Sequence, residues 1–150
     1  MGRYFAVDIG GTKTELARVS SKGEVEESRE IRTGDFRKPE ELKDGIVGVL
    51  REMLTEDIKG IGISAPGLID YDKGCIMDWT LRPDLAGYSF RNVIGDELGM
   101  PSSIRNDVEC FAMGEWAFGA GKKERPDVFV GVIKGTGVGA CLLLNGMPYR

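Results

Sequence analysis

The stretch AVDIGGTKTELARV, Ala6–Val19, decides the fold, because it carries an apolar run into an acid and two glycines and then into a second alternating run. Apolar Tyr4–Ile9 predicts a buried strand, and the alternation over Thr14–Ser20 predicts a strand that returns beside it. A turn and a third, more exposed strand over Val25–Arg32 follow. Two consecutive hairpins therefore predict an antiparallel meander at the amino end.

Beyond the meander, helical and strand patterns alternate. Apolar residues at helical spacing predict three helices, one from Pro39, one over Phe90–Leu98 and one over Asn106–Phe118. Strands are predicted over Ile58–Ser64, Pro101–Ile104, Val128–Ile133 and Val138–Leu144, with a loop and short hairpin over Ile69–Asp78. Large apolar side chains in and near these elements are predicted to be core: Trp79, Phe111, Met113, Trp116 and Phe118. This order predicts an α/β fold with a mixed sheet, in which the meander is followed by βαβα units and ligands bind at strand ends.

Composition and charge exclude several classes of partner. The 150 residues carry a net charge of −4 and scattered lysines and arginines, so we expect neither a nucleic acid nor an anionic membrane as partner. No apolar run is long enough to cross a bilayer, and a strand that begins by Tyr4 leaves no room for a signal peptide. Three widely spaced cysteines favour a reducing compartment, and we expect a cytoplasmic protein. Because the chain has no histidine, acid–base chemistry would use a carboxylate or a lysine.

The first glycine turn has the composition of a phosphate site. Gly10 and Gly11 permit a positive φ and let backbone N–H groups approach a ligand, while Thr12 and Lys13 add a hydroxyl and a positive charge. Asp8 would repel a phosphate unless Mg²⁺ lies between them, bound directly or through water. A plain hairpin in which Asp8 caps the turn explains these residues about as well.

A second stretch, VIKGTGVGACLLLNG, repeats this design with Gly135, Thr136, Gly137 and Gly139 between two strands. Glycines at strand ends cost backbone entropy, so two such clusters indicate a shared purpose. Two opposed hairpin turns that hold one polyphosphate would supply it. Neither turn is a Walker motif or a strand-to-helix dinucleotide fingerprint.

Five stretches carry a resemblance to a known family: DIGGTK (Asp8–Lys13), SAPG (Ser64–Gly67), RPDLAGY (Arg82–Tyr88), NDVECFAMGE (Asn106–Glu115) and GTGVGA (Gly135–Ala140). By these motifs and their order, the sequence resembles the ROK family of sugar kinases and sugar-responsive repressors, within the actin-like, hexokinase-like ATPase superfamily. The resemblance implies a ribonuclease-H-like lobe whose two glycine turns are phosphate loops.

The resemblance also implies a general base. By themselves, Asn106 and Asp107 at the start of a helix are typical of an N-cap. Phosphoryl transfer to an alcohol needs a group that orients the hydroxyl and takes its proton. The resemblance assigns that role to Asp107 and has Asn106 hydrogen-bond neighbouring sugar hydroxyls.

Two further stretches would contact the sugar. Ala65, Pro66 and Gly67 would bring backbone groups to it, which is compatible with their being a rigid turn. Family members resembling this chain carry Asn-Leu-Pro-Gly-Trp where this sequence has Asp84 and the residues after it. An ionised Asp84 accepts hydrogen bonds but does not donate them, so the identity of the hexose is left open.

The resemblance matches residues 1–133 to an amino-terminal lobe and 134–150 to the opening hairpin of a second lobe. We therefore expect a protein about twice as long, with any zinc motif and the adenosine-binding wall in its other half. The implied function is ATP- and Mg²⁺-dependent phosphorylation of a hexose or hexose derivative, as by a glucokinase, fructokinase or N-acetylhexosamine kinase, in a homodimer. Two alternatives stay open: a sugar-binding regulator of the ROK type without catalysis, and another actin-like ATPase with a different acceptor.

Overall fold

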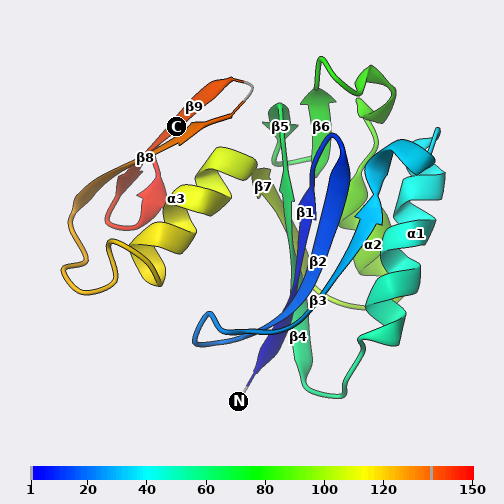
Figure 1. The fold of residues 1–150 in the computed structure, drawn as a ribbon, viewed down its shortest axis with the longest axis horizontal. Coiled ribbons are helices and arrows are strands. Elements are labelled where there is room, and N and C mark those ends of the chain that lie inside the picture. Colours follow the sequence, from blue (N-terminus) through cyan, green and yellow to red (C-terminus); the bar gives the residue numbers. More distant parts are fainter. Residues whose placement is uncertain (1, 136) are drawn as a thin grey trace. The chain divides into compact units, whose positions relative to one another are not determined.

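The computed structural model describes residues 2–135 and 137–150. They form two compact units that divide between Arg105 and Asn106 (Figure 1). The predicted boundary at residue 133 concerns the lobes of a longer protein and stays a prediction.

The first unit is built on a five-stranded sheet (Figure 1). The strands of that sheet are β1 (Arg3–Ile9), β2 (Lys13–Ser20), β3 (Val25–Arg32), β4 (Ile58–Ala65) and β7 (Ser102–Asn106). Their order across the sheet is β3-β2-β1-β4-β7, with β1, β2 and β3 antiparallel and β4 parallel to β1. The predicted meander and mixed sheet are therefore confirmed.

Smaller elements of the first unit surround this sheet: η1 (Thr33–Asp35), α1 (Pro39–Glu52), β5 (Leu68–Asp70), β6 (Cys75–Asp78), η2 (Pro83–Leu85) and α2 (Phe90–Leu98). Strands β5 and β6 form the short antiparallel hairpin predicted within 69–78. Helix α2 has the predicted bounds, and it ends at Gly99, whose left-handed conformation caps it. Figure 1 shows α1 and α2 side by side against one face of the sheet.

The core of this unit follows from alternation along β1. Phe5, Val7 and Ile9 are buried, each at 1% exposure, whereas Asp8 points to the opposite face of the strand and is exposed. Leu42 and Ile46 of α1 are completely buried in the same cluster. The strand thus turns its apolar residues toward the helices and leaves its acid outside the core, at its carboxyl end.

The second unit consists of α3 (Asp107–Ala117) and an antiparallel sheet of β8 (Val128–Lys134), β9 (Val138–Leu144) and β10 (Met147–Pro148). The helix lies close to β8, since a Cβ on Gly131 would come within 2.6 Å of the Cβ of Ala112. The indole N–H of Trp116 donates to the carbonyl of Pro126 at 3.0 Å. The predicted order of helix, strand, glycine turn and strand is therefore confirmed.

Two predictions of core residues in this unit are wrong. Phe111 is 40% exposed and Phe118 is 49% exposed, because α3 is apolar nearly all round and the sheet covers only one side of it. Met113 and Trp116 do pack against the buried cluster of the unit, and Trp79 is buried in the first unit. Helical spacing alone therefore did not separate the covered side of α3 from its uncovered side.

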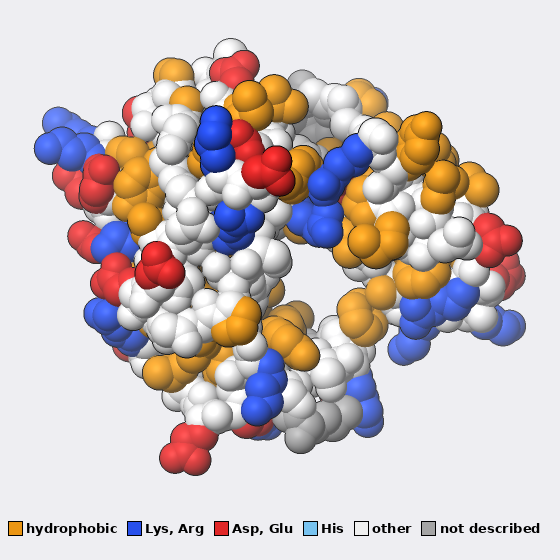
Figure 2. Space-filling view, turned by 180° about the vertical axis from the view of Figure 1, so that it is seen from behind, with side chains coloured by type: hydrophobic (Ala, Val, Ile, Leu, Met, Phe, Trp, Pro, Cys, Tyr) orange, Lys and Arg blue, Asp and Glu red, His pale blue; other side chains and the backbone are white. Residues whose placement is uncertain are grey.

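One face of the β8–β9 sheet is apolar and exposed. Val128, Val130 and Val132 alternate along β8 with exposures of 62%, 58% and 55%, and Val138 and Leu144 of β9 are exposed beside the same row. Figure 2, seen from behind, shows apolar side chains gathered over the second unit. Strands with this much exposed valine are unusual on a solvated surface.

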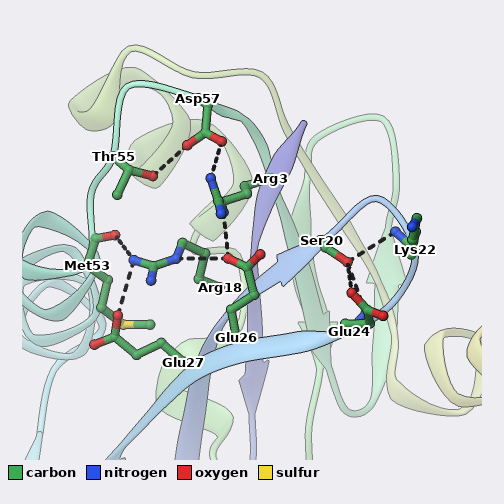
Figure 3. A network of polar contacts seen from close by, with 10 residues as sticks. All are labelled: Arg3, Arg18, Ser20, Lys22, Glu24, Glu26, Glu27, Met53, Thr55 and Asp57. Carbon is green, nitrogen blue, oxygen red and sulfur yellow. Dashed lines mark hydrogen bonds and ion pairs between the residues drawn. The ribbon is translucent and has the colours of Figure 1, made fainter. Parts of the chain in front are cut away.

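A polar network joins the elements at the start of β1 (Figure 3). Arg3 pairs with Glu26 at 2.5 Å and with Asp57, while Arg18 pairs with Glu26 at 3.4 Å and donates to the carbonyl of Met53 at 3.0 Å. This network links β1, β2 and β3 to the end of α1, at the opposite end of β1 from the glycine turn.

Within residues 2–135 and 137–150, none of the helices has the length and apolar character that a membrane span requires.

Candidate functional site

The first glycine turn connects β1 to β2 as a tight hairpin. The N–H of Gly10 donates to the carbonyl of Lys13 at 2.9 Å, and a Cβ on Gly10 would lie 2.6 Å from that oxygen. The positive φ that glycine permits is not adopted at Gly10 or Gly11. Gly10 is required by the close approach of the two strands instead.

Asp8 lies at the end of β1 beside the end of β4. Parallel pairing places Ser64 opposite Asp8, and the Ser64 hydroxyl donates to Oδ1 of Asp8 at 2.6 Å. The described residues hold no cluster of three or more His, Cys, Asp or Glu side chains that could bind a metal unaided. Mg²⁺ in phosphate sites commonly takes one or two carboxylates and completes its shell with phosphate and water. A single exposed carboxylate beside a glycine turn fits that donor set.

Lys13 is engaged by carboxylates of the meander. Its ammonium pairs with Glu15 and, at 2.9 Å, with Glu30. The hydrogen bonds that Lys13 donates to Glu15 and Glu30 raise its pKa above the ordinary value. Lys13 is therefore charged, and a phosphate would have to compete with two carboxylates for it.

The stretch after β4 lies beside the glycine turn. Gly67 has φ +82°, and a Cβ there would overlap the carbonyl oxygen of Asp78 in the β5–β6 hairpin. A Cβ on Gly11 would lie 3.6 Å from Cζ2 of Trp79, which follows the same hairpin directly. The predicted sugar-contacting residues Ala65, Pro66 and Gly67 therefore share one edge of the unit with the first glycine turn.

Asp84 is tied to an arginine for which the sequence pattern indicates no role. Nε and Nη2 of Arg82 donate to the two oxygens of Asp84 at 2.8 and 2.6 Å. Nη1 and Nη2 also donate to the carbonyls of Thr33 and Phe36 at 3.2 and 3.1 Å. The hydrogen bonds from Arg82 lower the pKa of Asp84, so its carboxyl is ionised.

The segment that anchors Arg82 also holds the glycine turn. The N–H of Thr33 donates to the carbonyl of Thr12 at 3.0 Å. The hydroxyls of Thr14 and Thr33 hydrogen-bond to each other at 2.9 Å, and both residues are fully buried. The turn and the Arg82–Asp84 pair are thus joined through one threonine.

In the second unit, Asn106 is the N-cap of α3. The N–H of Val108 donates to Oδ1 of Asn106 and to Oδ1 of Asp107, each at 2.9 Å. Asp107 lies in the first turn of the helix, where the dipole favours a carboxylate. A Cβ on Gly139 would lie 2.5 Å from Cγ2 of Val108, so the start of β9 packs on this turn. Thr136 lies outside the described residues.

The structure therefore assembles two groups of predicted site residues. Asp8–Lys13, 65–67 and Asp84 lie at one edge of the first unit. Asn106 and Asp107 lie beside the start of β9 in the second unit, next to the turn that contains Gly135 and Gly137. That both groups face a single ligand stays a prediction.

Comparison with known proteins finds relatives that match nearly the whole chain. A model of the ROK family matches residues 4–150. The glucokinase of Halalkalibacterium halodurans is 29% identical over 149 residues, which are 95% of this chain and 44% of that protein. The N-acetyl-D-glucosamine kinase of Vibrio cholerae is 31% identical over 150 residues, which are 97% of this chain and 48% of that protein. The chain spans about half the length of the curated relatives it matches.

A solved structure shows the same arrangement of elements. The ROK family glucokinase of Streptomyces griseus, in complex with glucose and AMPPNP, matches with a TM-score of 0.83 and 26% identity over 99% of this chain and 46% of that chain. This likeness confirms the predicted fold class, a mixed α/β sheet of the kind found in the actin-like sugar kinases.

Proposed function

Because the chain belongs to the ROK family, we propose that it serves in the ATP-dependent phosphorylation of a hexose or hexose derivative. The observation that supports this most is the match over 4–150, since that range contains both glycine turns and Asp107. Relatives named glucokinase and N-acetyl-D-glucosamine kinase support the same class of substrate.

On the nucleotide side, we propose that the first glycine turn and the turn from Gly135 to Gly139 hold the phosphates of ATP from two sides. Asp8 would hold Mg²⁺, which when bound neutralises charge on the phosphates. The Ser64 hydroxyl fixes Asp8 by its 2.6 Å hydrogen bond, so the carboxylate keeps one orientation. The tight pairing of Gly10 with Lys13 keeps the backbone of the turn rigid.

On the sugar side, the Asp107 carboxylate would accept the proton of the attacking hydroxyl. The hydroxyl oxygen bonds to the γ-phosphorus, the bond from that phosphorus to the bridging oxygen breaks, and ADP leaves. The hydrogen bond from the N–H of Val108 orients the Asp107 carboxylate for this proton transfer. Asn106, Asp84 and the backbone of 65–67 would hold the remaining hydroxyls.

A coupled ADP-release assay on the full-length protein tests the proposal. D-glucose, N-acetyl-D-glucosamine and a sugar-free control are supplied with Mg·ATP. ADP formed only with a sugar supports the sugar kinase. ADP formed equally without sugar would instead indicate another actin-like ATPase, and sugar binding without ADP would indicate a sensor.

A further inference from the structure

We infer that Arg82 is a positioning residue of the sugar site, which holds Asp84 as a fixed, ionised acceptor for a donor group of the substrate. This inference rests on the proposed function, because it takes Asp84 to contact the sugar. The observation behind it is the set of hydrogen bonds that the Arg82 guanidinium donates.

All three guanidinium nitrogens of Arg82 donate hydrogen bonds. Nε and Nη2 form a two-pronged pair with the Asp84 carboxylate, at 2.8 and 2.6 Å. Nη1 and Nη2 reach the carbonyls of Thr33 and Phe36. A planar guanidinium held at four points cannot rotate without losing several charge-assisted hydrogen bonds. The Arg82 side chain is only 15% exposed, which strengthens these bonds relative to those of a solvated arginine.

Asp84 remains able to bind a ligand while it is paired. Its side chain is 37% exposed, and each carboxylate oxygen has a second lone pair beyond the one that Arg82 uses. An ionised carboxylate only accepts hydrogen bonds, whereas an asparagine amide both accepts and donates. The pair therefore favours a substrate that presents a hydroxyl or an amide N–H at this position.

Arg82 also fixes the distance from this acceptor to the glycine turn. The carbonyl of Thr33 accepts from Arg82, and the N–H of the same residue donates to the carbonyl of Thr12 in the turn. A shift of about 1 Å in a substrate-positioning group can reduce a rate roughly a hundredfold. A rigid link between a sugar acceptor and a phosphate-binding turn would prevent such a shift.

The test compares Arg82→Gln and Asp84→Asn with the wild type in the full-length protein, with Arg91→Gln as control. Arg91 is a matched control because it also donates to two loop carbonyls, those of Tyr71 and Asp72. The probes are D-glucose and N-acetyl-D-glucosamine, of which the one with the lower KM is carried forward. The measurements are KM for the sugar and for ATP, kcat, and the pH dependence of the sugar KM.

We expect Arg82→Gln to raise the sugar KM about tenfold to a hundredfold, the effect of losing a hydrogen bond to a charged group. The KM for ATP should change little. Sugar affinity should decrease at low pH as Asp84 is protonated, and this decrease is the acid limb of the pH profile. The acid limb should move to higher pH in Arg82→Gln, because Asp84 loses the partner that keeps it ionised. It should disappear in Asp84→Asn. Arg91→Gln should leave both quantities as in the wild type.

Each other outcome is decisive. A folded Arg82→Gln variant with the sugar KM and acid limb of the wild type overturns the inference but leaves the kinase intact. A wild type that neither binds nor phosphorylates a sugar overturns the proposed function, and the inference with it. If Arg82→Gln does not fold, Arg82→Lys replaces it, since lysine keeps the charge but not the two-pronged geometry, and the same shifts are expected.

Discussion

At the scale of single residues, turnover is expected to depend most on the Asp107 carboxylate. Asp107→Asn keeps the size of the side chain and its ability to accept from the N–H of Val108, but it removes the group that takes the proton. We expect kcat to fall roughly a hundredfold to ten-thousandfold with sugar affinity nearly unchanged.

The control for that experiment is Asp96→Asn, which makes the same chemical change on the exposed surface of α2. Stopped-time ADP assays and sugar titrations of both variants give the comparison. Equal turnover of Asp107→Asn and Asp96→Asn would remove Asp107 from the mechanism.

The Thr14–Thr33 hydroxyl pair is expected to stabilise the first unit as a pair rather than as two separate groups. Both residues are completely buried, so replacing either one by valine leaves the other hydroxyl without its partner. Each single variant should lose about 1–3 kcal/mol in the free energy of unfolding, while the double variant should lose less than the sum. Urea denaturation of the four proteins measures the coupling. Strict additivity would show that the hydrogen bond contributes nothing.

The sequence named some residues of the candidate site and missed others. Asp8, Gly10, Gly67 and Asp84 could be named because they stand in short motifs that the family resemblance covers. The role inferred for Arg82 depends on hydrogen bonds to carbonyls 49 and 46 residues away, at Thr33 and Phe36. No local pattern encodes contacts over that separation, so only the tertiary structure identifies Arg82.

At the scale of elements, the packing of α3 on β8 is expected to tolerate no side chain at Gly131. A Cβ there would lie 2.6 Å from the Cβ and 3.0 Å from the Cα of Ala112, so a backbone would have to move. Gly131→Ala should cost about 1–3 kcal/mol in the free energy of unfolding, the usual cost of overpacking.

Gly114→Ala is the matched substitution on the helix itself. A Cβ on Gly114 meets nothing within 4 Å, and alanine is the better helix former, so we expect a gain of about 0.5–1 kcal/mol. Thermal unfolding of both variants shows whether each substitution raises or lowers stability. A stable Gly131→Ala protein would contradict the close packing of helix and strand.

The elements themselves were predictable because their periodicities are strong. The strand at β1 and the bounds of α2 follow directly from the sequence. The exposed side of α3 did not. Phe111 and the C-cap residue Phe118 are exposed, whereas Met113 and Trp116 pack against the buried cluster, so apolar residues occupy both sides of the helix. A pattern without amphipathic contrast cannot indicate which side is covered.

At the scale of the whole molecule, stability is expected to fall in acid through the network at the start of β1. Arg3 lowers the pKa of Glu26, and the Thr55 hydroxyl together with Arg3 lowers that of Asp57. Groups with a lowered pKa bind fewer protons in the folded state than in the unfolded state. Their stabilising effect is therefore complete above the ordinary carboxyl pKa, about 4, and is lost as the pH falls through the lowered values.

Arg3→Gln is expected to weaken this dependence. The variant should be less stable than the wild type at pH 7, and the difference should shrink below about pH 4, as the wild-type carboxyls become protonated at their lowered pKa values. Lys38→Gln removes one positive charge at the start of α1 and serves as control. Urea midpoints at a series of pH values test this, and a constant difference at every pH would rule out the network as its cause.

The general plan of the molecule was also predictable, namely a meander followed by βαβα units and a glycine-turned hairpin. The joining of the two glycine turns around one nucleotide was predicted from their similarity alone. Such a long-range arrangement depends on contacts that a linear pattern does not contain, and it stays a prediction.

The row of Val128, Val130 and Val132 has a practical consequence for handling the 150-residue chain. An exposed apolar strand surface favours self-association, so concentrated samples of this polypeptide should scatter light and bind hydrophobic dyes. The double substitution Val130→Thr and Val132→Thr would keep the side chains β-branched and make that surface more polar. Light scattering of the two forms at matched concentration should show the substituted chain staying monodisperse for longer, which would make it the better starting material for crystals.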